Sequence, residues 1–249
     1  MNPIQPTREA RVDWSLLVSD EEWELYRPVL DAADARGVRY ALGGGLAFSE
    51  HSSRARNTKD IDLYILPADK DLAIEAVLSA GFHDLFDEKP YDRSWIYRGT
   101  RDGVIVDLIW SSPNHRMDVD ESWLESGPAI QLRDRVIRLL PAEELIWAKL
   151  YIVQRDRCDW PDLLNILNAE GEHLDWRRLL AEVGERDAPL LGGLLSTFRW
   201  LCPETAQAFP KWVWCHLGLI PPDGGPPSPV GEEREKILDS RDWFGPQAA

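Results

Sequence analysis

The sequence predicts an α+β fold, in which a mixed sheet flanked by helices is followed by a C-terminal helical domain. Helix-like and strand-like segments alternate over the first half of the 249 residues, which is typical of a chain that builds a layered sheet. From Pro141 onwards apolar residues recur at helical spacing, with Pro or Gly between the segments. We therefore expect a core domain at 1–140, a helical domain at 141–220, and a Pro/Gly-rich linker and tail at 221–249.

The first half has clear signals for where its elements begin and end. Ser19, with Glu22 three residues later, forms a capping box for a helix that Gly37 ends. A strand, a glycine turn with a helix, a strand and a helix follow, at 38–42, 43–53, 60–66 and 68–82. Three further extended pieces, expected as added strands of the same mixed sheet, lie at 94–99, 103–110 and 135–140. In the second half, helices are expected at 141–157, 159–171, 174–186 and 189–202.

Composition limits the class of protein. The 28 Lys and Arg against 43 Asp and Glu give a formal charge of −15, which repels polyanions and disfavours nucleic acid and anionic membranes as partners. The three cysteines show no CxxC spacing, which fits a reducing compartment better than a disulfide framework. With neither a signal peptide nor an apolar run of membrane-spanning length, we expect a soluble cytoplasmic protein without a membrane partner.

Two aspartates interrupt the strand expected at 60–66. Side chains alternate across a strand, so Asp60 and Asp62 share one face while Ile61 and Leu63 point to the other. Carboxylates this close repel each other. A divalent cation such as Mg²⁺, which prefers hard oxygen ligands, offsets this repulsion. The alternative is a strand end that enters solvent with two ordinary surface acids.

A glycine turn precedes the two aspartates. Gly44 and Gly45 lie between a strand and a helix, where a backbone can pass close to a ligand and the helix N-terminus offers N–H groups to phosphate. Asp107 is a lone charge in an apolar run and is costly to bury without a partner. Together these features indicate a metal-bound triphosphate, with Asp107 as a third carboxylate beside Asp60 and Asp62.

These residues resemble a known signature, which reads GG-x-A, a helix bearing His or Tyr, and then R-x-T-x-D-I-D. The matching positions, in order, are Gly44, Gly45, Ala47, His51, Arg56, Thr58, Asp60 and Asp62. This is similar to the polymerase-β-type nucleotidyltransferase superfamily and, within it, to the bacterial AbiEii-like branch. His51 stands one residue further from the arginine than in many members. A second block resembles the branch's K-x5-R-x-R-x-D-x2-D pattern through Lys149, Arg155, Arg157, Asp159 and Asp162. The likeness covers about residues 38 to 165 and implies a nucleotidyltransferase-type mixed sheet.

The resemblance implies roles for individual residues. Asp60 and Asp62 would hold two Mg²⁺ ions that also clamp a nucleoside triphosphate (NTP), and Asp107 would serve as a third metal ligand or as general base for an acceptor hydroxyl. The nucleotide-binding residues implied, with Lys149 and then Arg56 as leading cations for the departing pyrophosphate, are Gly44, Gly45, Arg56, Thr58 and Lys149.

The leading hypothesis is thus a Mg²⁺-dependent, ATP- or other NTP-binding transferase that moves a nucleoside monophosphate to an acceptor hydroxyl chosen by the helical half. The branch includes toxin components of toxin–antitoxin and phage-defence systems, which implies a tRNA or protein acceptor and a possible cognate antitoxin. A small-molecule acceptor, as in antibiotic-modifying relatives, and a non-catalytic nucleotide-binding module remain alternatives. The sequence leaves open the NTP, the acceptor, the oligomeric state and the roles of His51, Asp159 and Asp162.

Overall fold

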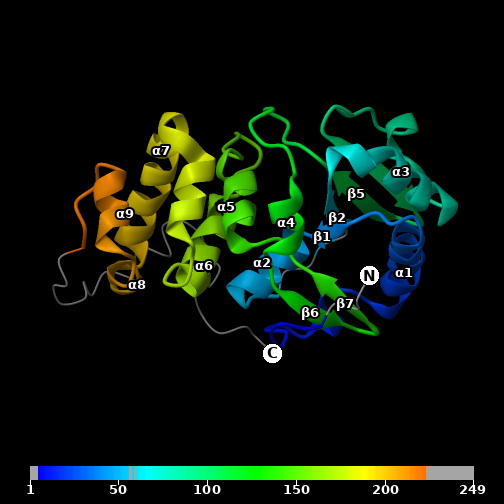
Figure 1. The fold of residues 1–249 in the computed structure, drawn as a ribbon, viewed down its shortest axis with the longest axis horizontal. Coiled ribbons are helices and arrows are strands. Elements are labelled where there is room, and N and C mark those ends of the chain that lie inside the picture. Colours follow the sequence, from blue (N-terminus) through cyan, green and yellow to red (C-terminus); the bar gives the residue numbers. More distant parts are fainter. Residues whose placement is uncertain (1–4, 56–57, 59, 223–249) are drawn as a thin grey trace. The chain divides into compact units, whose positions relative to one another are not determined.

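The computed structural model describes residues 5–55, 58 and 60–222 (Figure 1), and the chain divides into two compact units, Met1–Pro141 and Ala142–Ala249. A five-stranded mixed sheet flanked by helices forms the first unit, and helices form the described part of the second. The expected α+β fold with a helical C-terminal region is confirmed. No helix among the described residues is long and apolar enough to cross a membrane.

The main sheet has the strand order β1-β2-β5-β4-β3. Its strands are β1 Tyr40–Leu42, β2 Asp60–Ile65, β3 His83–Asp84, β4 Ile96–Arg101 and β5 Val104–Ile109. β2 and β5 pair in parallel at the middle of the sheet, whereas the other neighbours are antiparallel. The alternation predicted for β2 is confirmed, because Ile61 and Leu63 are buried and Asp60 and Asp62 are only half-buried. One face of β2 therefore belongs to the core and the other carries acids.

Helices α1 (Asp20–Ala35) and α3 (Lys70–Ser79) pack against each other and against β5 (Figure 1). The predicted capping box begins α1: the Glu22 N–H donates to the Ser19 hydroxyl at 3.2 Å, and the Ser19 N–H donates to the Glu22 carboxylate at 2.8 Å. α2 (Gly44–Ser52) follows the glycine turn directly, so the turn connects β1 to this helix.

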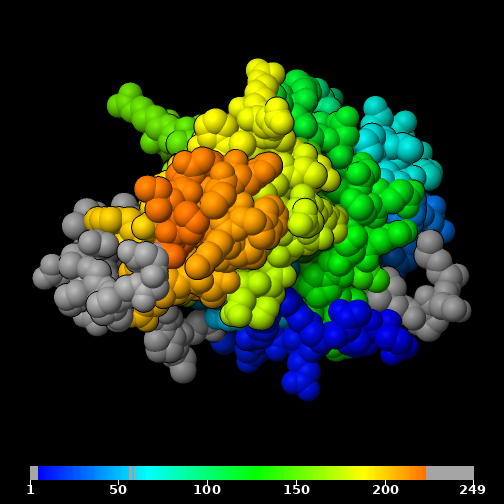
Figure 2. All heavy atoms as spheres, turned by 60° about the vertical axis from the view of Figure 1, so that its left-hand side comes forward, coloured from blue at the N-terminus to red at the C-terminus, as the bar shows by residue number. Residues whose placement is uncertain are grey.

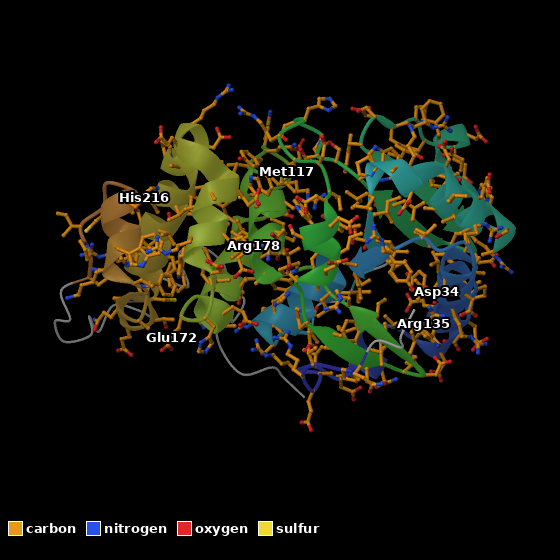
Figure 3. All side chains as sticks on the ribbon, viewed as in Figure 1. Asp34, Met117, Arg135, Glu172, Arg178 and His216 are labelled. Carbon is orange, nitrogen blue, oxygen red and sulfur yellow. The ribbon has the colours of Figure 1, made fainter. Side chains whose placement is uncertain are left out.

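The piece 135–140 does not join the main sheet as a strand, although Leu139 forms an isolated parallel bridge with Leu42 of β1. Residues Arg135–Arg138 form β7, which pairs antiparallel with β6 (Ala129–Leu132) in a separate two-stranded sheet. A two-residue turn joins the strands, and pairing with the adjacent segment costs less chain entropy than pairing with a distant one. Arg135 also contacts Asp34 of α1 (Figure 3). It forms a second ion pair with Asp31 of the same helix. The short helix α4 (Glu121–Glu125) and three 3-10 turns complete the unit, at Trp14–Leu16, Pro67–Asp69 and Leu85–Asp87.

The second unit packs its helices around aromatic side chains. Its helices are α5 Ala142–Leu150, α6 Trp160–Glu170, α7 Trp176–Leu201, α8 Pro203–Gln207 and α9 Lys211–His216. Phe209 stacks on Phe198 with 5.2 Å between ring centroids and also contacts Trp176 and Trp214, all four of which are buried. In Figure 2 the atoms of α7 to α9, coloured yellow to orange, form one continuous surface.

One helix of this unit is shorter than expected, and the break inside another is shifted. The helix expected at 141–157 ends at Leu150, and residues 152–159 instead form a small loop closed by a bridge between Val153 and Cys158. The β-branched pair Ile152 and Val153 disfavours helix, and Pro161 lies in the first turn of the next helix, which begins at Trp160. The two helices expected at 174–186 and 189–202 are present as the two parts of α7, which are separated by a non-helical break at Gly184, a few residues earlier than expected.

Candidate active site

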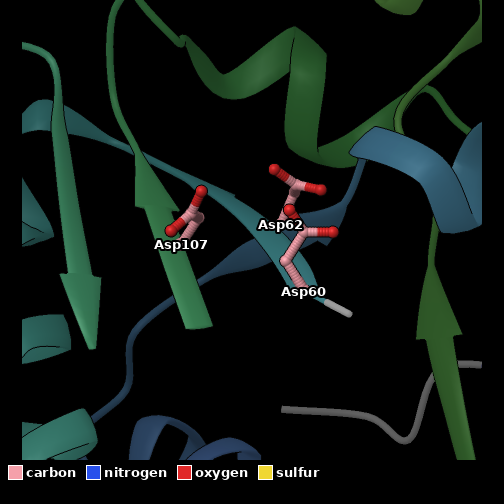
Figure 4. Close-up of side chains that lie close together, drawn as sticks. All are labelled: Asp60, Asp62 and Asp107. Carbon is pink, nitrogen blue, oxygen red and sulfur yellow. The ribbon is translucent and has the colours of Figure 1, made fainter. Parts of the chain in front are cut away.

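Three carboxylates converge on one face of the main sheet (Figure 4). Asp60 and Asp62 come from β2 and Asp107 from β5, and the parallel register sets Asp62 directly beside Asp107. One oxygen from each carboxylate lies within 4.8 Å of the other two. The predicted meeting of Asp107 with the two acids of β2 is therefore what the structure shows.

The environment of Asp107 differs from that of an ordinary surface acid. Asp107 is 2% exposed, and its Oδ1 atom is buried without a hydrogen-bond partner among the described residues. Burial raises the pKa of Asp107 to about 8, the Asp62 carboxylate adds to the rise, and the positive charge of Arg98 opposes it. A divalent cation fits this site, because three hard oxygen donors converge and one of them has an unsatisfied oxygen.

The glycine turn approaches the carboxylates closely. The Gly43 N–H donates to the Asp62 carbonyl oxygen at 2.8 Å. Gly44 has φ +55, and a Cβ atom at this position would overlap the Asp62 carboxylate. A Cβ atom at Gly45 would lie 3.1 Å from the Thr58 Oγ1 atom. The turn therefore requires glycine where Gly44 passes Asp62, and Gly45 lies against Thr58, whose side chain contacts Asp60.

Thr58 contacts the site through its hydroxyl, which donates to the Asp60 carboxylate. Thr58 is half-buried. This hydrogen bond fixes an oxygen of Asp60 at the first residue of β2, so Thr58 orients an acid in addition to any role with nucleotide. Arg56, the other residue expected in this loop to bind nucleotide, lies outside the described residues.

His51 is buried and contacts the backbone near the end of the first unit. Its ring is 2% exposed, and Nε2 lies 2.8 Å from the Leu140 carbonyl oxygen. The Leu140 N–H in turn donates to the Leu42 carbonyl oxygen at 2.9 Å. His51 thus fastens the end of the first unit to the helix that follows the glycine turn.

Lys149 lies in the second unit and is almost completely buried. Its Nζ donates to Asp159 at 2.7 Å and to Asp162 at 2.8 Å, and Arg157 donates to Asp159 at 2.9 Å. Burial alone would raise the pKa of Asp159, but the hydrogen bond from Arg157 and the charge of Lys149 outweigh it and lower this pKa overall. Lys149, Arg157, Asp159 and Asp162 therefore form one ion-paired network that joins α5 to α6.

Sequence reasoning missed Arg98. On β4 it stands opposite Asp107 in the antiparallel register, and its Nη2 atom lies 3.2 Å from Asp107 Oδ2. The sequence could have indicated Arg98 in the same way as Asp107, because it is a charged residue between Ile96 and Thr100, which are buried residues of the same strand. The strand register was needed to show which acid it faces.

No protein-family model and no curated protein matches the sequence. Among solved structures, the antibiotic-resistance factor ANT(2'')-Ia is 19% identical over 72% of this chain and 92% of its own, with a TM-score of 0.42. The lincosamide antibiotic adenylyltransferase LnuA is 14% identical over 60% of this chain and 97% of its own, with a TM-score of 0.42. An antigenic nucleotidyltransferase-like protein from Paracoccidioides brasiliensis is 19% identical over 77% of this chain and 93% of its own, with a TM-score of 0.46. Similarities this low leave the function to be argued from the site itself.

Proposed function

We propose that the protein is a Mg²⁺-dependent nucleotidyltransferase that moves a nucleoside monophosphate from an NTP to an acceptor hydroxyl. The observation that carries the proposal is the meeting of Asp60, Asp62 and Asp107 beside a turn in which Gly44 touches Asp62. The acids suit a divalent cation, and the turn at the start of a helix suits phosphate. The two parts are adjacent, which favours one ligand that needs both.

Each part of the site has a proposed role in this reaction. Asp60, Asp62 and Asp107 would hold Mg²⁺, proposed here as two ions, and the metal charge would neutralise the triphosphate. Gly44 and Gly45 place backbone N–H groups of the α2 N-terminus next to the acids. The acceptor oxygen attacks the α-phosphorus, the bond to pyrophosphate breaks, and the acceptor proton passes to Asp107 or to solvent.

Arg56 and Lys149 remain proposed phosphate contacts. For Lys149 such a contact competes with existing bonds, because Asp159 and Asp162 already accept from its Nζ atom. A lysine neutralised by two buried carboxylates attracts an anion less strongly than a solvated one.

The acceptor and the biological setting are a further part of the proposal. From the sequence motif we assign the protein to the AbiEii-like branch, with a toxin–antitoxin or phage-defence role in the cytoplasm, a tRNA or protein acceptor, and a cognate antitoxin. The second candidate is a small-molecule, antibiotic-type acceptor, which the formal charge of −15 favours because that charge repels a polyanionic tRNA.

Labelled substrate tests the proposal. The protein is incubated with Mg²⁺ and each NTP labelled at the α-phosphate, together with tRNA, cell extract or a panel of hydroxylated antibiotics. We expect label in one acceptor class, pyrophosphate release, and loss of both in the Asp60→Ala/Asp62→Ala variant. An exposed acid at the β4–β5 turn provides the matched control, Asp102→Ala, which retains activity. Equal labelling by wild type and the double variant would overturn the proposal, and calorimetric binding of MgATP without pyrophosphate release would identify a non-catalytic module.

A further inference from the structure

We propose that Arg98 is the positioning residue of the metal centre: it holds one oxygen of Asp107 and thereby leaves the other oxygen directed at the cation. The inference rests on the proposed function, because it takes Asp60, Asp62 and Asp107 as the metal ligands. It adds a residue that the sequence motif does not contain.

The strand register places Arg98 in line with the acids. Asp62 on β2, Asp107 on β5 and Arg98 on β4 are direct neighbours across three adjacent strands. Asp107 thus lies between an acid on one side and a cation on the other. Its two oxygens are used differently, since Oδ2 lies 3.2 Å from the Arg98 Nη2 atom and Oδ1 has no hydrogen-bond partner among the described residues.

Arg98 is itself braced from the edge of the sheet. The Arg98 N–H donates to the Tyr91 hydroxyl oxygen at 2.8 Å, and the Tyr91 hydroxyl donates to Asp84 Oδ1 at 3.0 Å. The Tyr91 ring lies 5.9 Å from the guanidinium carbon, within the range of a cation–π contact. Asp84 is held in turn by an ion pair with Arg93. The segment before β4 therefore fixes both the backbone and the side chain of Arg98.

Two effects of Arg98 on a bound cation oppose each other. Its positive charge repels a cation, but its guanidinium is paired with Asp107 and its side chain is 35% exposed, so solvent screens this repulsion. Its contact with Oδ2 restricts the Asp107 carboxylate to one orientation, and partners that orient a metal ligand typically contribute about 10–100-fold in metal affinity. The second effect is the larger, so removal of Arg98 weakens metal binding.

Mn²⁺ provides a probe that does not depend on turnover. Free Mn²⁺ is measured by electron paramagnetic resonance in titrations of wild type, Arg98→Met, Arg98→Lys and Arg101→Met, and thermal melts check that each variant folds. Arg101 is the matched control, because it lies on the same strand but on the opposite face, where it donates to the Ala80 carbonyl oxygen at 2.8 Å. A Tyr91→Phe variant removes the hydroxyl bonds to the Arg98 backbone and to Asp84, while it leaves the ring contact and the guanidinium in place.

The expected result is a Kd for Mn²⁺ about tenfold or more higher in Arg98→Met, a smaller rise in Arg98→Lys and Tyr91→Phe, and no change in Arg101→Met. Wild-type or tighter Mn²⁺ binding by Arg98→Met overturns the inference and leaves the proposed function standing. If wild type itself binds no Mn²⁺, both the inference and the proposed metal site fail. An equal loss in Arg98→Met and Arg101→Met also overturns the inference, because the effect would not be specific to the face that carries the acids.

Discussion

Replacement of Gly44 by alanine tests whether the glycine turn and the acids form one site. Two costs are expected from the structure. The backbone at Gly44 has φ +55, a left-handed conformation that costs a residue with a Cβ atom about 1 kcal/mol. The new methyl group would also overlap the Asp62 carboxylate, so either the turn or Asp62 must move.

The chain offers a control with the first cost and without the second. Gly37 has φ +73, and a Cβ atom there would meet nothing within 4 Å. We expect Gly37→Ala to lower the free energy of unfolding by about 1 kcal/mol and to leave transfer activity unchanged. Gly44→Ala should lose more stability than this. Its activity should fall about a hundredfold or more, because a displacement of about 1 Å in a catalytic group typically costs that much.

Urea denaturation and initial rates of pyrophosphate release measure the two effects, with Mn²⁺ titration as a readout of the acids alone. The difference between the glycine variants isolates the contact with Asp62. Equal stability and equal activity of Gly44→Ala and Gly37→Ala would refute the claim that the turn and Asp62 are packed as one unit.

Two further predictions concern buried charges. The pKa of Asp107 is about 8 in the folded protein, against an ordinary value of 3.8, so the native state binds an extra proton between these pH values. In protein treated with chelator, the free energy of unfolding should therefore fall as pH rises from about 4 to about 8. Asp107→Asn should remove most of this slope in urea denaturation at a series of pH values, and an unchanged slope would contradict the assignment. Lys149→Met should lower the free energy of unfolding by about 3–5 kcal/mol, because it leaves Asp159 and Asp162 without their shared cation, whereas Lys211→Met at an exposed site should be neutral. Normal stability of Lys149→Met with lost NTP binding would instead support a phosphate contact.

Local signals in the sequence were sufficient where one segment determines its own structure. Ser19 and Glu22 define the start of α1, and the alternation of Asp60, Ile61 and Asp62 defines both faces of β2. Asp107 was identified as a lone charge in an apolar strand, and its place beside Asp60 and Asp62 was inferred from the cost of burying it without a partner. These features depend on chain periodicity and capping, which are local properties.

Most features that depend on pairing between distant segments were not predicted, and the meeting of Asp107 with Asp60 and Asp62 is the exception. The contact of Arg98 with Asp107 follows from the register of β4 on β5, which no single strand specifies. Residues 135–140 were assigned to the main sheet because their apolar pattern suits any strand. Residues Arg135–Arg138 instead pair with β6, which lies only a few residues earlier in the chain. Lys149 was expected to contact phosphate, and its ion pairs with Asp159 and Asp162 depend on the loop that ends α5.

The position of Asp107 argues against the simpler interpretation of the acids. If β2 and β5 merely ended in solvent, Asp107 would be exposed and its pKa would be ordinary, but the side chain is buried and its pKa is raised to about 8. An apolar side chain between Val106 and Leu108 would pack in the same strand without the cost of a buried carboxylate. A fold that retains such a group at the centre of its sheet, beside two further acids, violates its own packing pattern, and such violations are expected at functional sites. The stability of the sheet does not explain the cluster, and this supports the proposed cation site.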